Sequence, residues 1–396
     1  MDFSQSNNNL LCANVNEEQD CIIFGTKKGL YVYTLYPQKK IISRKIDGGV
    51  SKVSMLHRSN IIFFVGTLEN GPNSKQMLNI WDDSHKNIVG QIDFKDTIEH
   101  IHTTSDYIFV STKDTIFIYS FNNLQQIHSI SIEHTNSSLF KVKVDKHLLI
   151  YPSYNKMILY NWETKESKTI DCHIHTIELF SLSQDHSLLA TCSQKGSLLR
   201  IFNIDTLQQV KELRRGSDHV TIVNIAFNND ATLLLCSSNK GTIHIFSLSD
   251  TNKQPLLHTN KTIQIQDETE KTVIEDISKD TTDTQSKEQL LSEDTNNTTT
   301  IQNKKMYGTH YLKSFLPNYF NSEWSFIQIY LNHSITYSVF SKQTNNIITI
   351  ASNGCFYSIE FLYDSKSQQS SYKIVSTLKF LSDHNDPFDN RTSTIL

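Results

Sequence analysis

The stretch Leu188-Leu-Ala-Thr-Cys-Ser-Gln-Lys-Gly-Ser-Leu-Leu-Arg-Ile-Phe202 has the pattern of a strand, a tight turn and a second strand. Apolar residues form its two arms, and Lys-Gly marks the turn. The same pattern returns at Leu233-Leu-Leu-Cys-Ser-Ser-Asn-Lys-Gly-Thr-Ile-His-Ile-Phe246, with the tetrapeptide Leu213-Arg-Arg-Gly216 between the two copies. Two copies of one hairpin separated by a short connection indicate a repeat protein built from β-units.

Further copies of this unit recur along the chain with a period of roughly 40 residues, the length of one propeller blade. Added to the two units above, they make seven: Gly25–Tyr33, Leu78–Asp83, Ser111–Tyr119, Tyr154–Tyr160 and Ala351–Tyr357. A four-stranded blade buries its two faces only against neighbouring blades. We therefore predict an all-β fold, a single seven-bladed β-propeller over residues 1–396.

Three segments depart from this rhythm. Residues 252–304 are polar, rich in Asp, Glu, Thr, Asn and Gln, and predict a disordered insertion within blade six. Residues 305–320, which follow it, form a basic and aromatic segment. Residues 383–396 are expected to form a flexible C-terminal tail.

Composition restricts the function. The net charge of −4 gives no overall basic field, so we expect no binding to nucleic acid. The six cysteines are scattered without a Cys-x-x-Cys pair, which favours buried free thiols in a reducing compartment. The N-terminus has no secretory pattern and no apolar run reaches membrane-spanning length, so we expect a cytoplasmic protein.

Catalytic and metal-binding signatures are weak. Phosphate loops, nucleophile elbows and kinase motifs are missing from the sequence, so we do not expect an enzyme or a bound cofactor. The run Cys172-His-Ile-His175 has residue types that bind metals, but in a strand Cys172 would face away from the two histidines. We therefore expect no metal site.

The arginine pair is the strongest functional feature. Successive side chains of an extended chain alternate, so Arg214 and Arg215 are expected to point to opposite sides. Guanidinium binds phosphate through parallel hydrogen bonds. The pair between two repeats therefore predicts two anion sites, one for each flanking repeat.

Five motifs in order and in register resemble the PROPPIN family, seven-bladed propellers that bind polyphosphoinositides in autophagy and endosomal trafficking. The motifs are Met55-Leu-His-Arg-Ser-Asn-Ile-Ile-Phe-Phe-Val-Gly66 followed by Ile80-Trp-Asp-Asp83, Ser193-Gln-Lys-Gly-Ser-Leu-Leu-Arg200, Leu213-Arg-Arg-Gly216, Ser237-Ser-Asn-Lys-Gly-Thr-Ile-His-Ile-Phe246 and Leu316-Pro-Asn-Tyr-Phe-Asn-Ser-Glu-Trp-Ser-Phe326. The resemblance covers almost the whole chain. Leu213 stands where the family usually has Phe, and His219 where Arg is common.

The resemblance implies one lipid headgroup on each side of the arginine pair. The first site would comprise His173, Ser193, Ser197, Arg200 and Arg214. The second would comprise Arg215, His219, Ser238, Lys240, Thr242 and His244. Together with its basic and aromatic composition, the resemblance implies that the segment 305–320 contacts the membrane, with insertion by Met306, Tyr307, Tyr311, Leu312 and Phe315.

The function implied is that of a phosphoinositide-binding effector or scaffold in autophagosome formation and endosomal trafficking. The lipid would be phosphatidylinositol 3-phosphate, and also the 3,5-bisphosphate. The protein would lie peripherally on phagophore, preautophagosomal, endosomal or vacuolar membranes, with a protein of autophagic lipid transfer or conjugation as partner. The histidines in both sites should become protonated and bind phosphate better as the pH falls, so membrane affinity should rise from pH 7.5 to 6.

Two other interpretations use the same residues. The chain could be a WD-repeat scaffold for proteins without any lipid role, with the arginines forming structural ion pairs. It could also be an adaptor for phosphorylated peptides, because the same guanidinium groups bind phosphopeptides.

Overall fold

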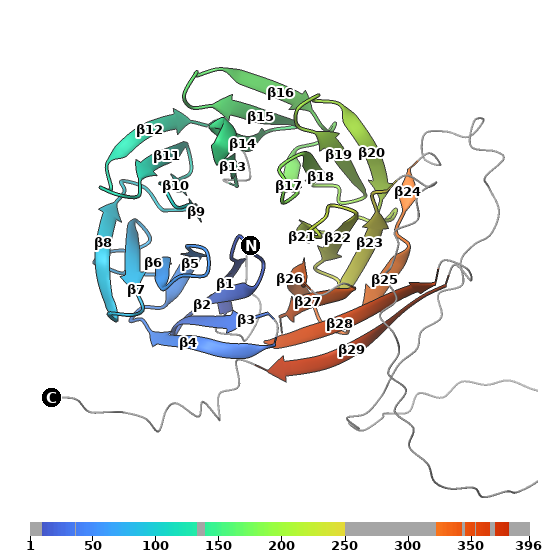
Figure 1. Cartoon of the computed structure of the whole chain (residues 1–396), viewed down its shortest axis with the longest axis horizontal. Helices are drawn as coiled ribbons and strands as arrows, with labels where there is room; N and C mark the ends of the chain where they lie inside the picture. Colours follow the sequence, from blue (N-terminus) through green and yellow to red (C-terminus); the bar gives the residue numbers. More distant parts are fainter. Residues whose placement is uncertain are drawn as a thin grey trace, which may run out of the picture.

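The computed structural model describes residues 10–35, 37–132, 139–249, 322–342, 345–352, 354–364 and 369–379. Seven sheets are arranged as blades in a closed ring, and in each the chain forms four antiparallel strands from the innermost to the outermost (Figure 1). The predicted seven-bladed propeller is confirmed.

The strands follow the same order in every blade. Blade one holds β1 (Leu10–Val15), β2 (Cys21–Thr26), β3 (Gly29–Thr34) and β4 (Lys39–Lys45). Blade two holds β5 (Val50–Met55), β6 (Ile61–Gly66), β7 (Met77–Asp82) and β8 (Asn87–Asp93). Blade three holds β9 (His100–Thr103), β10 (Tyr107–Ser111), β11 (Thr115–Ser120) and β12 (Gln126–Ser131).

Blade four holds β13 (Lys141–Lys143), β14 (Leu148–Ser153), β15 (Lys156–Asn161) and β16 (Ser167–Asp171), with the 3-10 turn η1 (Val144–Lys146) after β13. Blade five holds β17 (Ile177–Leu182), β18 (Leu188–Ser193), β19 (Leu198–Asn203) and β20 (Gln209–Arg214). Blade six holds β21 (Ile222–Phe227), β22 (Leu233–Ser238), β23 (Thr242–Ser247) and β25 (Ile327–Tyr330). Blade seven holds β26 (Ile335–Phe340), β27 (Asn346–Ala351), β28 (Cys355–Asp364) and β29 (Gln369–Lys379).

The seven sequence units each fall in a different blade. The two Lys-Gly turns of the opening stretches connect the second and third strands of blades five and six. Gly196 and Gly241 have φ angles of 66° and 82°, and a Cβ at either position would collide with a backbone carbonyl of the adjoining chain. Glycine is therefore required at both turns because the backbone is left-handed and closely approached there.

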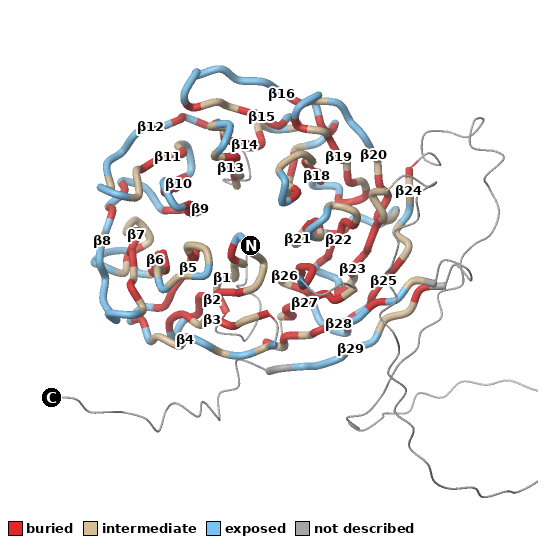
Figure 2. Tube along the Cα trace, viewed as in Figure 1, coloured by how far each residue is buried: buried red, intermediate tan, exposed pale blue. Residues whose placement is uncertain are grey.

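Apolar packing between blades forms the core. Seven buried clusters occur, and each joins the residues of two neighbouring blades around the ring. Second strands such as β2 and β22 are fully buried, whereas outer strands such as β8 and β16 are mostly exposed (Figure 2). We call these seven inter-blade contacts the seams.

Ring closure depends on one of these seams. Blades one and seven are each built from a continuous part of the chain, so no strand is shared between them within the described residues. The seam between them packs Phe24 and Ile22 of β2 against Ile348 and Ile350 of β27. Closure of the ring therefore depends on apolar burial rather than on strand pairing.

The chain leaves blade six after β23 and returns to it at β25, so the expected insertion does lie within this blade. The insertion 252–304, the basic and aromatic segment 305–320 and the tail 383–396 lie outside the described residues. On its return the chain first forms β24 (Glu323–Trp324), which pairs in parallel with β20 and extends blade five to five strands.

The cysteines agree with the sequence analysis. All six have free thiols, and Cys21, Cys172, Cys192 and Cys236 are buried. Within the described ranges, no helix has the length and apolar character needed to cross a bilayer.

We predict that Phe24→Ala lowers the free energy of unfolding by about 3–5 kcal/mol, because it removes a fully buried ring from the closing seam. Ile41→Ala is the control, since Ile41 lies on the outer strand β4 and is 45% exposed. Its cost should stay below about 1 kcal/mol. Urea unfolding followed by tryptophan fluorescence measures both values, and equal destabilisation would contradict the importance of this seam.

Candidate functional site

Arg214 and Arg215 lie where β20 ends. Arg214 is in register with Leu198 of β19 on one side and with Trp324 of β24 on the other. The backbone N–H of Arg215 donates to the carbonyl of Ser197 at 3.0 Å. Both arginine side chains are buried, at 8% and 7% exposure, which is rare for arginine unless it is paired or functional.

The two guanidinium groups have different surroundings. Arg215 donates through Nε to the Gly196 carbonyl at 3.0 Å and through Nη2 to the Asp218 carbonyl. Its charge also acts on His244 of blade six. The charge of Arg214 instead acts on Glu212 within its own strand. Each arginine therefore serves a different neighbourhood, as the alternation of an extended chain predicts.

The first group of predicted residues lies along the seam between blades four and five. His173 follows β16, and its Nε2 is 3.0 Å from Oγ1 of Thr191 in β18. Arg200 of β19 donates through Nη1 to the carbonyl of Cys172 at 2.7 Å, next to His173. Its Nε donates to Oε2 of Glu212 at 2.9 Å. The structure thus links His173 and Arg200 through short contacts.

The serines of this group frame the hairpin turn of blade five. Ser193 ends β18 and Ser197 precedes β19, and each is 7% exposed. The N–H of Gly196 donates to the Ser193 carbonyl at 2.9 Å, which closes the turn. The two hydroxyl residues are therefore held at one end of the blade, where Arg215 also binds the turn.

The second group lies along the seam between blades five and six. The hydroxyl oxygens of Ser238 and Thr242 are 2.6 Å apart across the hairpin turn of blade six. Nδ1 of His244 in β23 is 3.0 Å from the hydroxyl of Ser325, which follows β24. Arg215, Ser238, Thr242 and His244 are thus gathered on adjoining elements.

Lys240 and His219 differ from the others because both are exposed. Lys240 is tied to the turn only through its backbone N–H, which donates to the Ser238 hydroxyl at 3.3 Å. Within the described residues, the side chains of Lys240 and His219 form no ion pair or hydrogen bond. Met306, Tyr307, Tyr311, Leu312 and Phe315 lie outside the described residues, so their predicted membrane role stays a prediction.

The two groups hold equivalent places in successive blades. Arg200 of β19 lies opposite Thr191 of β18, and His244 of β23 lies opposite Cys236 of β22. Both precede an Ile-Phe pair in the third strand of their blade. The blade repeat therefore presents two similar clusters of hydroxyl, imidazole and cationic groups, side by side.

Burial changes the expected protonation of the histidines. Burial, reinforced by the charge of Arg200, lowers the pKa of His173 to about 4. Burial, reinforced by the charge of Arg215, lowers the pKa of His244 to about 4 as well. The expectation that these rings become protonated between pH 7.5 and 6 is therefore wrong for the unliganded protein, and we expect neutral rings that donate one hydrogen bond.

Several residues that surround these groups were not predicted from the sequence. Glu212 contacts Arg200 and Ser325 contacts His244, whereas Ser322 contacts Glu212. Trp324 is half-exposed and lies in register with Arg214. Ser322–Phe326 has strand-like composition and ends the fifth motif of the resemblance, but neither signal indicates which strand it pairs with. Its pairing with β20 joins residues more than a hundred positions apart, and no local pattern predicts such a contact.

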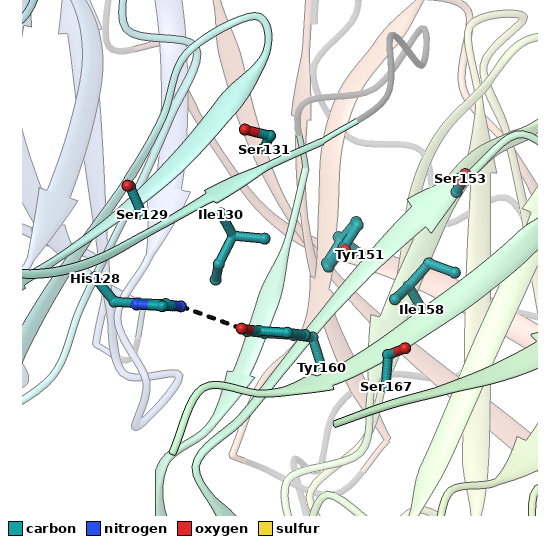
Figure 3. Close-up of a pocket in the computed structure, with 9 residues that line it drawn as sticks. All are labelled: His128, Ser129, Ile130, Ser131, Tyr151, Ser153, Ile158, Tyr160 and Ser167. Carbon is teal, nitrogen blue, oxygen red and sulfur yellow. Dashed lines mark hydrogen bonds between the residues drawn. The ribbon is translucent and has the colours of Figure 1, made fainter. Parts of the chain in front are cut away.

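A separate cavity of about 550 Å³ lies elsewhere on the ring, between β12 and blade four (Figure 3). Hydroxyl side chains and His128 line it, and Nε2 of His128 is 3.1 Å from the Tyr160 hydroxyl. None of its lining residues is a lysine or arginine. The cavity is therefore poorly suited to a phosphate group compared with the arginine pair.

A metal centre is not formed by the part of the chain that the structure describes. No group of three His, Cys, Asp or Glu side chains there could hold a metal ion, and this includes the Cys172-His-Ile-His175 run.

The structure is thus a β-propeller that carries two neighbouring clusters of cationic, imidazole and hydroxyl side chains. A family profile described as PROPPIN matches residues 9–260. The chain belongs to this family, whose members are phosphoinositide-binding propellers related to autophagy.

Individual relatives agree with this assignment. The chain is 31% identical over 257 residues to autophagy-related protein 18e of Arabidopsis thaliana, a match that covers 62% of this chain and 68% of the relative. It is 28% identical over 243 residues to SVP1-like protein 2 of Kluyveromyces lactis, covering 59% and 68%. The solved structure of Kluyveromyces lactis Hsv2 matches with a TM-score of 0.68 at 21% identity, covering 94% of this chain and 99% of that one. The structural match thus extends the likeness to the last blade, beyond the profile match.

We predict that acid destabilises the protein partly through His173 and His244. Below about pH 6.5 the unfolded chain binds a proton at each ring, whereas the folded protein does not until about pH 4. The stability that depends on the two neutral rings is therefore fully present above about pH 6.5. It is lost as the pH falls towards 4, by on the order of 2 kcal/mol per histidine.

The measurement is the free energy of urea unfolding at pH 7.5 and 4.5. The variant His173→Gln/His244→Gln should lose less stability on acidification than the wild type, because glutamine does not titrate. Equal losses would show that these two rings titrate normally.

Proposed function

We propose that the chain binds phosphatidylinositol 3-phosphate, and also the 3,5-bisphosphate, through two sites that flank Arg214 and Arg215. Binding would recruit it as an effector or scaffold to phagophore, preautophagosomal, endosomal or vacuolar membranes. The observation that carries this proposal is the buried arginine pair, whose members face two equivalent clusters on successive blades.

The chemistry of each cluster suits a phosphorylated inositol ring. Arg215 is held by two backbone carbonyls, so its remaining N–H groups are preorganised for a phosphate. Ser238 and Thr242 supply hydroxyl donors, and the neutral ring of His244 supplies one more hydrogen bond. Lys240 adds an exposed cation at the turn.

Two sites on one rigid edge favour a membrane as ligand. The second headgroup binds at a high effective concentration once the first is held, which raises avidity by about a hundredfold or more. Trp324 supports this orientation, because it lies in register with Arg214 and is 50% exposed. Tryptophan is enriched at the interface between bilayer and water, so this edge is suited to face the lipid.

A protein partner from the autophagy machinery is proposed as well, in lipid transfer or in conjugation. One solved neighbour is a complex of KlAtg21 with the coiled coil of AgAtg16, and it matches this chain with a TM-score of 0.61 at 19% identity. This likeness supports the fold, and the partner of the present chain stays a proposal.

The test is flotation with vesicles that contain or lack 3 mol% phosphatidylinositol 3-phosphate. Arg214→Thr and Arg215→Thr should each weaken binding about tenfold, since each removes charged hydrogen bonds, and the double variant should abolish flotation. Arg58→Thr is the matched control, because it removes the same charge from a side chain of blade two that is 65% exposed. It should float like the wild type.

Flotation of a folded double variant at the wild-type level would contradict the proposal and favour a protein scaffold without a lipid role. Soluble inositol 1,3-bisphosphate should compete with the vesicles. If a phosphopeptide competes and the inositol headgroup does not, the adaptor interpretation holds instead.

A further inference from the structure

The two clusters are equivalent in position but unequal in charge. In the first, Arg200 is in an ion pair with Glu212, with 2.9 Å between Nε and Oε2. In the second, among the residues that the structure describes, Arg215 donates only to backbone carbonyls and Lys240 forms no ion pair. Among the described residues, only the first cluster therefore has a cation that is paired with a carboxylate.

Glu212 is held in place by three features of the fold. It lies opposite Arg200 in the antiparallel pair of β19 and β20, so the two side chains share a face. Its Oε1 accepts a hydrogen bond from the Ser322 hydroxyl at 2.7 Å. It stands two residues before Arg214, on the same side of β20. The carboxylate is thus placed between the two arginines of the first cluster.

The carboxylate is ionised at neutral pH. Burial alone raises the pKa of Glu212, but hydrogen bonds from Ser322 and Arg200 and the charges of Arg200 and Arg214 outweigh it, so the pKa is lowered overall. A phosphate that enters the first site therefore approaches the Glu212 carboxylate, which is already in an ion pair with Arg200. It must displace this carboxylate or bind beside it against electrostatic repulsion.

We infer that Glu212 is an internal competitor for Arg200 that weakens the first headgroup site relative to the second. The inference rests on the proposed function and concerns the phosphorylated inositol ring as ligand. The second site then binds first, and the first site fills once the headgroup is held at high effective concentration. Ser322 follows residues 250–321 in the sequence and donates a hydrogen bond to Glu212. It therefore connects this part of the chain to the first site.

The test compares Glu212→Gln with Glu323→Gln. Glu323 lies in β24 and pairs with Lys211, whose side chain is on the opposite face of β20 from Glu212. Both variants change the net charge equally, so their difference reports the site rather than the general attraction to an anionic surface. Binding is measured in the Arg215→Thr background, which isolates the first site, by calorimetry with soluble inositol 1,3-bisphosphate and by vesicle flotation.

Glu212→Gln should bind the soluble headgroup and the vesicles about 3- to 10-fold more tightly, and Glu323→Gln less than about 2-fold. Ser322→Ala should give a smaller gain, because it loosens the carboxylate without removing it. Adding Arg200→Gln should cancel the gain of Glu212→Gln, since the competition is for that guanidinium. Ser322→Ala keeps the test valid if Glu212→Gln does not fold.

Three results would overturn the inference. Weaker binding by Glu212→Gln would show that the carboxylate positions Arg200 for the ligand. A gain equal to that of Glu323→Gln would show a general charge effect, and so would a gain on vesicles without one on the soluble headgroup. Failure of the wild-type protein to bind either ligand would instead contradict the proposed function itself.

Discussion

Apolar packing at the seven seams is the constraint on which the rest of this structure depends. Each blade is apolar on both faces and can bury them only against its two neighbours. Because no strand is shared between blades one and seven in the described chain, the ring is closed by the same kind of contact. The two candidate sites lie at successive seams, one on each side of blade five.

The buried polar groups at these two seams are stabilised by their fixed partners. Arg215 is anchored to the Gly196 carbonyl, and the turn that supplies it exists only because glycine adopts a left-handed conformation there. β24 completes the arrangement, since Ser322 and Ser325 at its two ends contact Glu212 and His244. One short segment therefore contacts both clusters, although residues 250–321 separate it from β23 in the sequence.

Much of the fold could be predicted from the sequence, because a propeller repeats a local signal. The recurring unit of two apolar strands joined by a polar turn identified all seven blades, and strand alternation predicted that Arg214 and Arg215 face different neighbourhoods. The surroundings of the sites could not be predicted. The contact between Ser322 and Glu212 spans 110 positions, and the low pKa of His173 depends on burial that only the assembled blades create.

The central claim is that two equivalent seams carry two headgroup sites divided by the arginine pair. The stoichiometry of binding tests it most directly. Calorimetric titration of the wild-type chain with soluble inositol 1,3-bisphosphate should give two headgroups per chain, and one in either Arg214→Thr or Arg215→Thr. A single headgroup per wild-type chain, or two that remain after either substitution, would contradict the account.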